Sequence, residues 1–218
     1  MSTVKDIYSF LDGLYPRTLS CEWDNDGLMV CRNSEREVKR VLLALDVTRK
    51  VADEAISGGY DLIISHHPLI FRPLKQLSEE YAGALIPMKL FSAGVSVISL
   101  HTRFDAGEGG INDTLAALLG LDVISPFGPD GEKCGRLCTT SETTAHGLCN
   151  KIKETLGAPC VLCGNPEKEI RTVALLGGDG KSFISEALKV GADAFVTGAS
   201  GYNAALEAAD RELAVIDA

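Results

Sequence analysis

The feature that most constrains the fold is an internal repeat, because the segments 41–66 and 173–198 align without a gap. Each copy reads as an apolar strand, an amphipathic helix of about three turns, a glycine and a second apolar strand. Gly59 and Gly191 occupy equivalent places, where glycine suits the left-handed position that ends a helix. A strand–helix–strand segment of this size is a right-handed βαβ unit with parallel strands. The chain is therefore predicted to contain two similar βαβ-containing repeats.

The stretch between the two copies adds a helix over 81–94, a strand over 95–101 and a helix over 110–121. Asn112 or Asp113 is a suitable N-cap for the last of these helices. Strands and helices thus alternate along the chain, and the predicted fold class is α/β with mixed sheets flanked by helices.

The turn-rich stretch 125–135 is the best candidate for a boundary between lobes. It divides the chain into an N-terminal lobe over 1–125 and a C-terminal lobe over 126–218, which contains the second repeat. A helix capped by Thr143 or Thr144 is predicted to follow the boundary.

Composition and charge narrow the class of protein. The chain has 218 residues, 45% of them hydrophobic, which is enough for a sizeable core. Its formal net charge of −9 disfavours a broad nucleic-acid-binding face. No apolar stretch approaches the roughly 20 residues of a membrane helix, and the N-terminus lacks the apolar segment of a secretory signal. We therefore expect a cytoplasmic protein with no membrane partner.

The seven cysteines are scattered, which indicates reduced thiols and not a disulfide framework. Cys160 and Cys163 have the CxxC spacing of some zinc and redox sites, and Cys134 and Cys138 lie four apart. We favour the interpretation that they are small core or surface residues, with zinc binding or redox chemistry as the alternative.

Two of the four histidines, His66 and His67, stand side by side at the end of an apolar run. Adjacent residues of a strand point to opposite faces, so one site can use both only where the strand ends. Pro68 supplies that end because it has no N–H for a sheet ladder. The pair is predicted to lie at the C-terminal edge of a sheet, where α/β proteins bind ligands.

A second apolar strand stops at His101, and Asp105 follows in a glycine-rich stretch. If both strands end at one edge, His66, His67, His101 and Asp105 converge. Imidazoles and a carboxylate together suit zinc, manganese, iron or nickel. A carboxylate can also bridge two ions about 3.5–4 Å apart, as in two-metal hydrolases. The bland alternative is a set of hydrogen-bonded structural histidines, and His146 is interpreted as an ordinary surface residue.

The sequence GGDGKS, residues 177–182, follows a strand and precedes a helix. It departs from the P-loop pattern, because Leu175 stands where the first glycine of that pattern belongs. A tight strand-to-helix turn is the favoured interpretation, and a nucleotide phosphate near Lys181 and Ser182 is the alternative.

Several motifs together resemble the type 2 GTP cyclohydrolase I family, also described as Nif-three-like dinuclear metal-centre hexameric proteins. They are EWDNDGLMV, ISHHPLIF, HTRFDAGEGGINDTLAALLGL, GGDGKSFISEALKVGADAFVTG and the terminal VIDA, and they occur in the family's order over nearly the whole chain. The resemblance implies an α/β fold with two intertwined repeats and a ring-shaped homohexamer.

The resemblance also implies two divalent metal ions per subunit, with His66, His67 and Asp105 as metal ligands and Asp105 as the bridge. His101 matches a position beside the metals, as a ligand or as a catalytic base. Family members continue after IDA into a Gly-His run and a glutamate, which supply further ligands. This sequence ends at Ala218, so we expect weak metal binding and depleted occupancy.

A further departure lies in the segment 197–205, where relatives often carry an acidic residue and a histidine. Ala199 and Asn203 stand there instead, which argues against a role for this loop in proton transfer.

The resemblance implies a metal-dependent hydrolase that opens the guanine ring of GTP, so a nucleotide is the expected substrate. The alternative is a non-enzymatic hexamer that binds metal or a regulatory partner through the same ligands. A relative that folds without activity at this site is the third reading.

Overall fold

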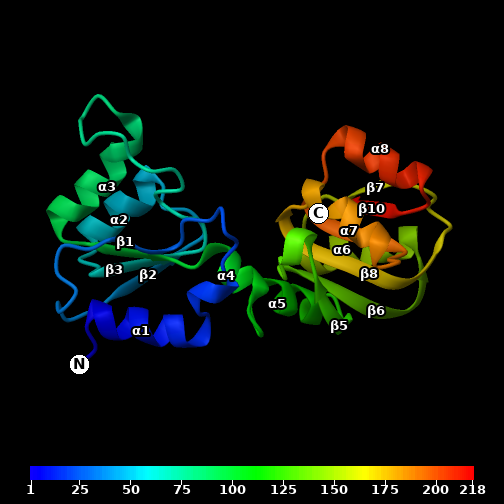
Figure 1. The fold of residues 1–218 in the computed structure, drawn as a ribbon, viewed down its shortest axis with the longest axis horizontal. Helices are drawn as coiled ribbons and strands as arrows, with labels where there is room; N and C mark the ends of the chain where they lie inside the picture. Colours follow the sequence, from blue (N-terminus) through cyan, green and yellow to red (C-terminus); the bar gives the residue numbers. More distant parts are fainter. The chain divides into compact units, whose positions relative to one another are not determined.

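The computed structural model of the protein describes the chain from Met1 to Ala218, except for the side chains of residues 130 and 142. The chain forms two compact units, Met1–Phe104 and Asp105–Ala218 (Figure 1). The boundary therefore lies upstream of the predicted one after residue 125. The turn-rich stretch 125–135 is instead a connection within the second unit, joining two antiparallel neighbours of its sheet.

The first unit contains a four-stranded sheet in the order β1-β4-β3-β2. The strands β2, β3 and β4 are parallel, and β1 runs antiparallel to β4. The elements of this unit are α1 (Val4–Leu14), η1 (Arg17–Leu19), β1 (Gly27–Val30), β2 (Val41–Ala44), α2 (Arg49–Ser57), β3 (Leu62–Ser65), α3 (Ala82–Ala93) and β4 (Ser96–Ser99). A short helix, α4 (His101–Ala106), carries the chain into the second unit.

Helices cover both faces of the first sheet, with α2 and α3 on one side and α1 on the other (Figure 1). Alternating side chains of the strands point to the two sides. Ile63 and Val97 belong to the core cluster with α2 and α3. Leu62 and Ile98 pack with residues of α1 in a separate cluster. The central strands β3 and β4 are thus packed on both faces, as their apolar sequence predicts.

The second unit contains a six-stranded mixed sheet in the order β5-β6-β8-β9-β10-β7. Among the strand pairs that the structure describes in this sheet, β8-β9 and β9-β10 are parallel and the others are antiparallel. Its elements are α5 (Ile111–Leu118), β5 (Asp122–Phe127), η2 (Pro129–Gly131), β6 (Gly135–Thr144), α6 (Ala145–Leu156), β7 (Val161–Cys163), β8 (Glu169–Asp179), η3 (Lys181–Phe183), α7 (Ile184–Lys189), β9 (Ala194–Ala199), α8 (Tyr202–Asp210) and β10 (Ala214–Asp217).

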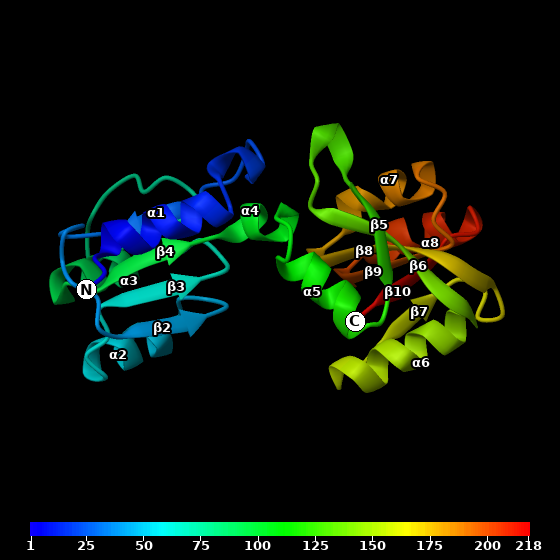
Figure 2. The same cartoon turned by 90° about the horizontal axis from the view of Figure 1, so that it is seen from below.

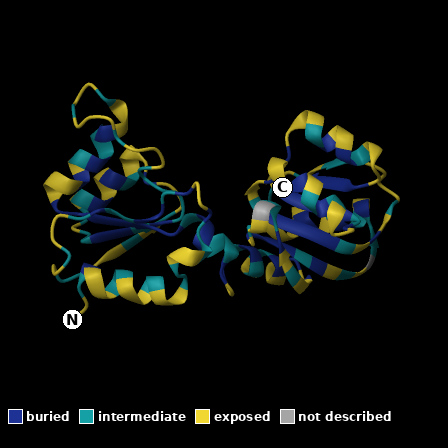
Figure 3. Cartoon of the chain, viewed as in Figure 1, coloured by how far each residue is buried: buried dark blue, intermediate teal, exposed yellow. Residues whose placement is uncertain are grey.

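Within the second unit, α7 and α8 lie on one side of the sheet and α6 on the other (Figure 2). One core cluster joins α5 and α6 to one face of the strands, through residues such as Leu148, Ile152, Val173 and Val196. In both units the central strands are buried and the outer surfaces of the helices are exposed (Figure 3). The predicted α/β class is confirmed in each unit.

The duplication extends to the register of the strands. Val41 pairs with Leu62 in the first copy, and the equivalent Val173 pairs with Ala194 in the second. Gly59 and Gly191 both have the left-handed backbone predicted for them, with φ of 65° and 71°. The two copies therefore share both their strand pairing and the end of their helix.

An equivalent aspartate serves the same purpose in each copy. Asp61 accepts hydrogen bonds from the backbone N–H groups of Lys39 and Arg40, just before β2. Asp193 accepts from Arg171 and Thr172, the matching positions in the second copy. Burial would raise the pKa of each carboxyl group, but these hydrogen bonds outweigh burial and lower it. Each aspartate ties the start of one parallel strand to the next.

The predicted caps and ends of the elements are confirmed in part. Thr144 caps α6 as predicted, since its side chain accepts from Gly147 N. Helix α5 begins after Gly110, which makes no side-chain cap, whereas Asp113 accepts from Gly109 N and pairs with Arg136. The predicted strand over 95–101 ends at Ser99. Across the part of the chain that the structure describes, no helix has the length and apolar character to cross a membrane.

Candidate functional site

His66 and His67 directly follow β3, and His101 is the first residue of α4, just after β4. Because β3 and β4 are parallel and Ser65 pairs with Ser99, both chain segments leave the first sheet at the same edge. The backbone N–H groups of His66 and His67 still donate to Ala44 and Leu45 O, which keeps this segment extended beyond the strand. His66 and His67 therefore lie at the C-terminal ends of the parallel strands, as predicted.

The three imidazole rings lie close together. Their ring centroids are 4.9 Å apart for His66 and His67, 5.5 Å for His66 and His101, and 5.7 Å for His67 and His101. Two imidazoles that bind one ion at about 2.0–2.1 Å place their ring centres roughly 5 Å apart. The spacing of the rings is thus close to the spacing that a shared divalent ion requires.

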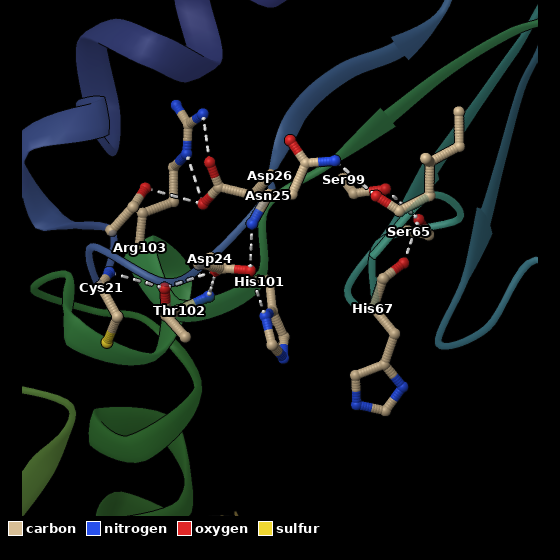
Figure 4. A network of polar contacts seen from close by, with 12 residues as sticks. Cys21, Asp24, Asn25, Asp26, Ser65, His67, Ser99, His101, Thr102 and Arg103 are labelled. Carbon is tan, nitrogen blue, oxygen red and sulfur yellow. Dashed lines mark hydrogen bonds and ion pairs between the residues drawn. The ribbon is translucent and has the colours of Figure 1, made fainter. Parts of the chain in front are cut away.

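His101 is oriented by a buried carboxylate. Its Nδ1 lies 2.9 Å from Oδ1 of Asp24, whose side chain is fully buried (Figure 4). Thr102 donates from its backbone N–H and its hydroxyl to the other oxygen of Asp24. Burial by itself would raise the pKa of Asp24, but hydrogen bonds from His101 and Thr102 outweigh it and lower the pKa. An ionised Asp24 favours the proton on Nδ1 and turns Nε2 away from it.

His67 has an equivalent partner that is more exposed. Its Nδ1 lies 2.8 Å from Oδ1 of Asp46, in the turn after β2, and about half of each side chain is exposed. The hydroxyl of Ser65 donates to the carbonyl of His67 and also contacts the hydroxyl of Ser99. The Ser65 contacts join the ends of β3 and β4 and reach the backbone of His67 (Figure 4).

A buried arginine fixes the segment that contains Asp24. Arg103 is fully buried and donates to both carboxylate oxygens of Asp26, at 3.0 and 2.8 Å. It also donates to Asp12 and to the carbonyl of Tyr15. Burial by itself would lower the pKa of the guanidinium. Its hydrogen bonds to Asp26 and the other acceptors outweigh burial and raise the pKa, so Arg103 stays charged. A bidentate pair of this kind holds a loop in one geometry.

Asp105 lies on α4, one helical turn after His101. The spacing of four residues places the two side chains on one face of this helix. Asp105 is the first residue of the second unit. Its predicted part as a bridging ligand stays a prediction.

The donor set fits a divalent ion by its chemistry. Three imidazoles with carboxylates behind two of them match the pattern in which a carboxylate orients a metal-binding histidine. Among the residues whose side chains are described, however, no three His, Cys, Asp or Glu form a ready metal cage. The rings are gathered, but a finished coordination shell is not built from them alone.

Sequence reasoning missed Asp24 and Asp46, the two carboxylates that orient histidines. Asp24 lies within the quoted motif EWDNDGLMV, but it is 77 residues from His101 and no local pattern links the two. Asp46 was open to prediction, because it follows the end of a parallel strand next to the strand that ends before His67.

The remaining predicted features have structural explanations. His146 is exposed and contacts only Asn150 in the described hydrogen-bond network of its helix. Cys160 has Cys149 as its hydrogen-bonding thiol neighbour, outside the CxxC spacing. Gly180 belongs to the GGDGKS turn, where a Cβ atom would lie 2.3 Å from the Thr197 hydroxyl. Close packing against β9 is therefore sufficient reason for that glycine.

The fold and the site together define an α/β protein with a duplicated βαβ core and a histidine cluster at one strand edge. The chain belongs to the Duf34/NIF3 (NGG1p interacting factor 3) family, whose model matches residues 2–218. The resemblance found from the sequence motifs is thereby confirmed.

Individual relatives agree with this assignment. A GTP cyclohydrolase 1 type 2 homolog of Clostridium acetobutylicum is 34% identical over 223 residues, covering 99% of this chain and 82% of the relative. A hypothetical protein of Staphylococcus aureus has a similar structure, with a TM-score of 0.87, 29% identity, and coverage of 99% of this chain and 85% of that one. Reduced HcgD from Methanocaldococcus jannaschii has a TM-score of 0.85 at 26% identity, covering 99% and 86%.

Proposed function

We propose that this chain is a metal-dependent hydrolase that resembles GTP cyclohydrolase 1 type 2 and acts at the cluster of His66, His67 and His101. The observation that supports the proposal most is the gathering of three imidazoles at one strand edge, with ring centroids 4.9–5.7 Å apart. Carboxylates beside His67 and His101 add to it, because a metal-binding or catalytic histidine is usually oriented by a carboxylate at its other ring nitrogen.

In this proposal His66 and His67 hold the divalent ion, which when bound supplies a Lewis acid that makes nearby water acidic enough to react near neutral pH. His101 takes a proton from the attacking water and returns it to the leaving group. Asp24 keeps the imidazole of His101 in one tautomer during both transfers and stabilises its protonated form. Asp46 fixes the orientation of the imidazole of His67 through its contact with Nδ1.

The nucleotide substrate is proposed from the named relatives, which are called homologs of GTP cyclohydrolase 1 type 2. Hydrolytic opening of the guanine imidazole ring consumes one water and leaves a formamide, and a second water hydrolyses this formamide to release formate. Each step needs an activated water and a proton donor beside the ring. The histidine cluster offers groups of both kinds.

The test combines metal binding with product formation. We expect His67→Ala to weaken binding of zinc or manganese at least tenfold, because one imidazole donor is lost. His146→Ala, at an exposed histidine of the second unit, is the matched control and should leave metal affinity unchanged. Calorimetric titration measures affinity, and formate release from GTP measures turnover with each metal added.

The outcomes separate the alternatives. Metal binding that depends on His67, without formate from GTP, would favour the non-enzymatic metal-binding reading of the same ligands. Equal metal affinity in the parent protein and in His67→Ala would contradict the proposed site altogether.

A further inference from the structure

Two exposed aromatic rings stand beside the histidine cluster. Trp23 is 57% exposed and Phe71 is 46% exposed, although both are large apolar side chains. Their ring centroids are 6.1 Å apart, and each lies about as far from His101, at 6.1 Å for Trp23 and 6.2 Å for Phe71. All three pairs are edge-to-face, with interplanar angles of 69°, 77° and 87°. The three rings form a corner next to the proposed reacting group.

Hydrogen bonds hold the two segments that supply these rings. Asn25, two residues after Trp23, donates through its side chain to the carbonyl of Ile70, which precedes Phe71. Asp24, which lies between Trp23 and Asn25 in the chain, is held by hydrogen bonds with His101 and Thr102. Neither aromatic ring is therefore on a loose loop. Their exposure is a built feature of the segments around the cluster, and it leaves apolar ring surface in contact with water at a cost.

We propose that Trp23 and Phe71 form a stacking surface that holds the planar heteroaromatic ring of the substrate, such as a purine base, beside His101. The inference rests on the proposed function and names the part of the substrate that these residues contact. Aromatic side chains stack on bases of any sequence, because every base has a π face. The edge of a base held there would face the imidazole of His101.

The charge of the chain favours this assignment over binding through phosphates. A formal net charge of −9 gives a polyanionic nucleotide no long-range attraction to the molecule. Contacts with the base must then supply much of the affinity. The aromatic corner is the apolar surface nearest to His101 among the ring contacts of the described residues.

The chain offers a direct reporter, because Trp23 is its only tryptophan. With excitation selective for tryptophan, guanosine should quench the fluorescence of the parent protein in a saturable way. Ribose 5-phosphate, which lacks the ring, should leave it unchanged. Quenching by ribose 5-phosphate as strong as that by guanosine would overturn the proposal, since binding would then depend on the sugar or phosphate.

Variants test whether both rings take part. Trp23→Leu and Phe71→Leu should each weaken guanosine binding, measured by calorimetry, by about five- to a hundredfold, the range for loss of one stacked aromatic ring. Trp23→Phe should retain most of the affinity because it keeps an aromatic face. Phe91→Leu is the matched control, since Phe91 is 50% exposed on α3 and has no part in the corner.

The proposal can fail separately from the proposed function. Unchanged guanosine affinity in Trp23→Leu, with metal binding still dependent on His67, would overturn the stacking surface and leave the hydrolase intact. If guanosine quenches the fluorescence of the parent protein but the parent protein binds no metal, the stacking surface would stand and the proposed hydrolase would be contradicted. A smaller molar mass of Trp23→Leu in light scattering, with guanosine affinity unchanged, would assign the rings to a contact between copies and also overturn the proposal.

Discussion

At the residue scale, the two histidines with carboxylate partners are held through the same ring nitrogen. His101 and His67 both use Nδ1 to contact a carboxylate, so Nε2 of each ring is the atom turned away from that partner. The two pairs differ in burial: Asp24 is fully buried, whereas Asp46 is 55% exposed. A buried partner restricts the ring more strongly, because water does not compete for the hydrogen bond.

The two carboxylates orient histidines with different proposed parts, which leads to separate predictions. Asp46→Asn should weaken affinity for zinc about tenfold, the lower end of the usual effect of losing a carboxylate that orients a metal-binding histidine, because solvent already shares its hydrogen bond. Asp24→Asn should leave zinc affinity unchanged and lower formate release from GTP about 100-fold or more, because it orients the proton-transferring His101. Calorimetric titration with zinc and formate release from GTP measure the two effects.

The matched control for the exposed pair is Asp53→Asn, since Asp53 is 52% exposed and pairs with Lys89 instead of a histidine. It should bind zinc like the parent protein. Equal formate release by Asp24→Asn and the parent would contradict an orienting part for Asp24.

At the element scale, the repeat is built on a shared hydrogen-bonding device. Asp61 and Asp193 each stand at the start of the second strand of a βαβ unit. Asp61 accepts from the backbone just before β2, and Asp193 accepts from Arg171 and Thr172 near the start of β8. Their lowered pKa values mean that folding favours the ionised carboxylates. The unfolded chain then binds protons more readily than the folded chain in acid, so stability is lost as the pH falls through the folded pKa.

Asp193→Asn tests this device in the second unit. We expect it to lower the free energy of unfolding at pH 7 by about 1–2 kcal/mol, since charged hydrogen bonds become neutral ones. The difference from the parent should shrink below about pH 4, where the unfolded aspartate is protonated. Urea unfolding followed by circular dichroism at pH 7 and in acid measures both effects.

Asp210→Asn, at an exposed position of α8, is the control and should change neither the stability nor its pH dependence. A loss of stability in Asp193→Asn that is the same at both pH values would contradict an electrostatic origin.

The elements also show what a sequence can and cannot predict here. The two βαβ units were predictable because apolar periodicity and glycines at helix ends are local signals. The meeting of His66, His67 and His101 followed from parallel strands that end at one edge. The helix at His101–Ala106 was not predicted, because the segment is short and the glycines that follow it do not indicate a helix.

Longer-range features were beyond any local pattern. Arg103 is buried by its contacts with Asp26 and Asp12, which are 77 and 91 residues away in the chain. The unit boundary at Phe104 depends on which sheet α5 and β5 pack against, whereas the turn-rich composition of 125–135 reports only a change of direction. The burial of Arg103 and the position of the unit boundary thus depend on tertiary contacts, which the composition of the sequence does not indicate.

At the scale of the whole molecule, a sheet edge presents apolar side chains to solvent. Strand β2 is the last strand of the first sheet, and its exposed residues include Leu43, at 74% exposure. Leu45, directly after the strand, is 62% exposed. Open strand edges with exposed apolar residues favour pairing with another chain, and natural proteins usually protect them. An assembly of copies, which the resemblance predicts to be a homohexamer, would give such protection.

We therefore expect the purified protein to form a homo-oligomer and Leu43→Glu to shift it to a smaller species, because a charge placed on a covered edge costs the contact its burial energy. Light scattering after gel filtration measures the molar mass. Leu77→Glu, at a loop leucine that is 70% exposed, is the matched control and should leave the mass unchanged. A parent protein that is monomeric at micromolar concentration would contradict the expectation, and equal masses for the parent and Leu43→Glu oligomers would place the contact on another surface. In that case Leu43 and Leu45 would stay exposed to water, which is unfavourable for large apolar side chains.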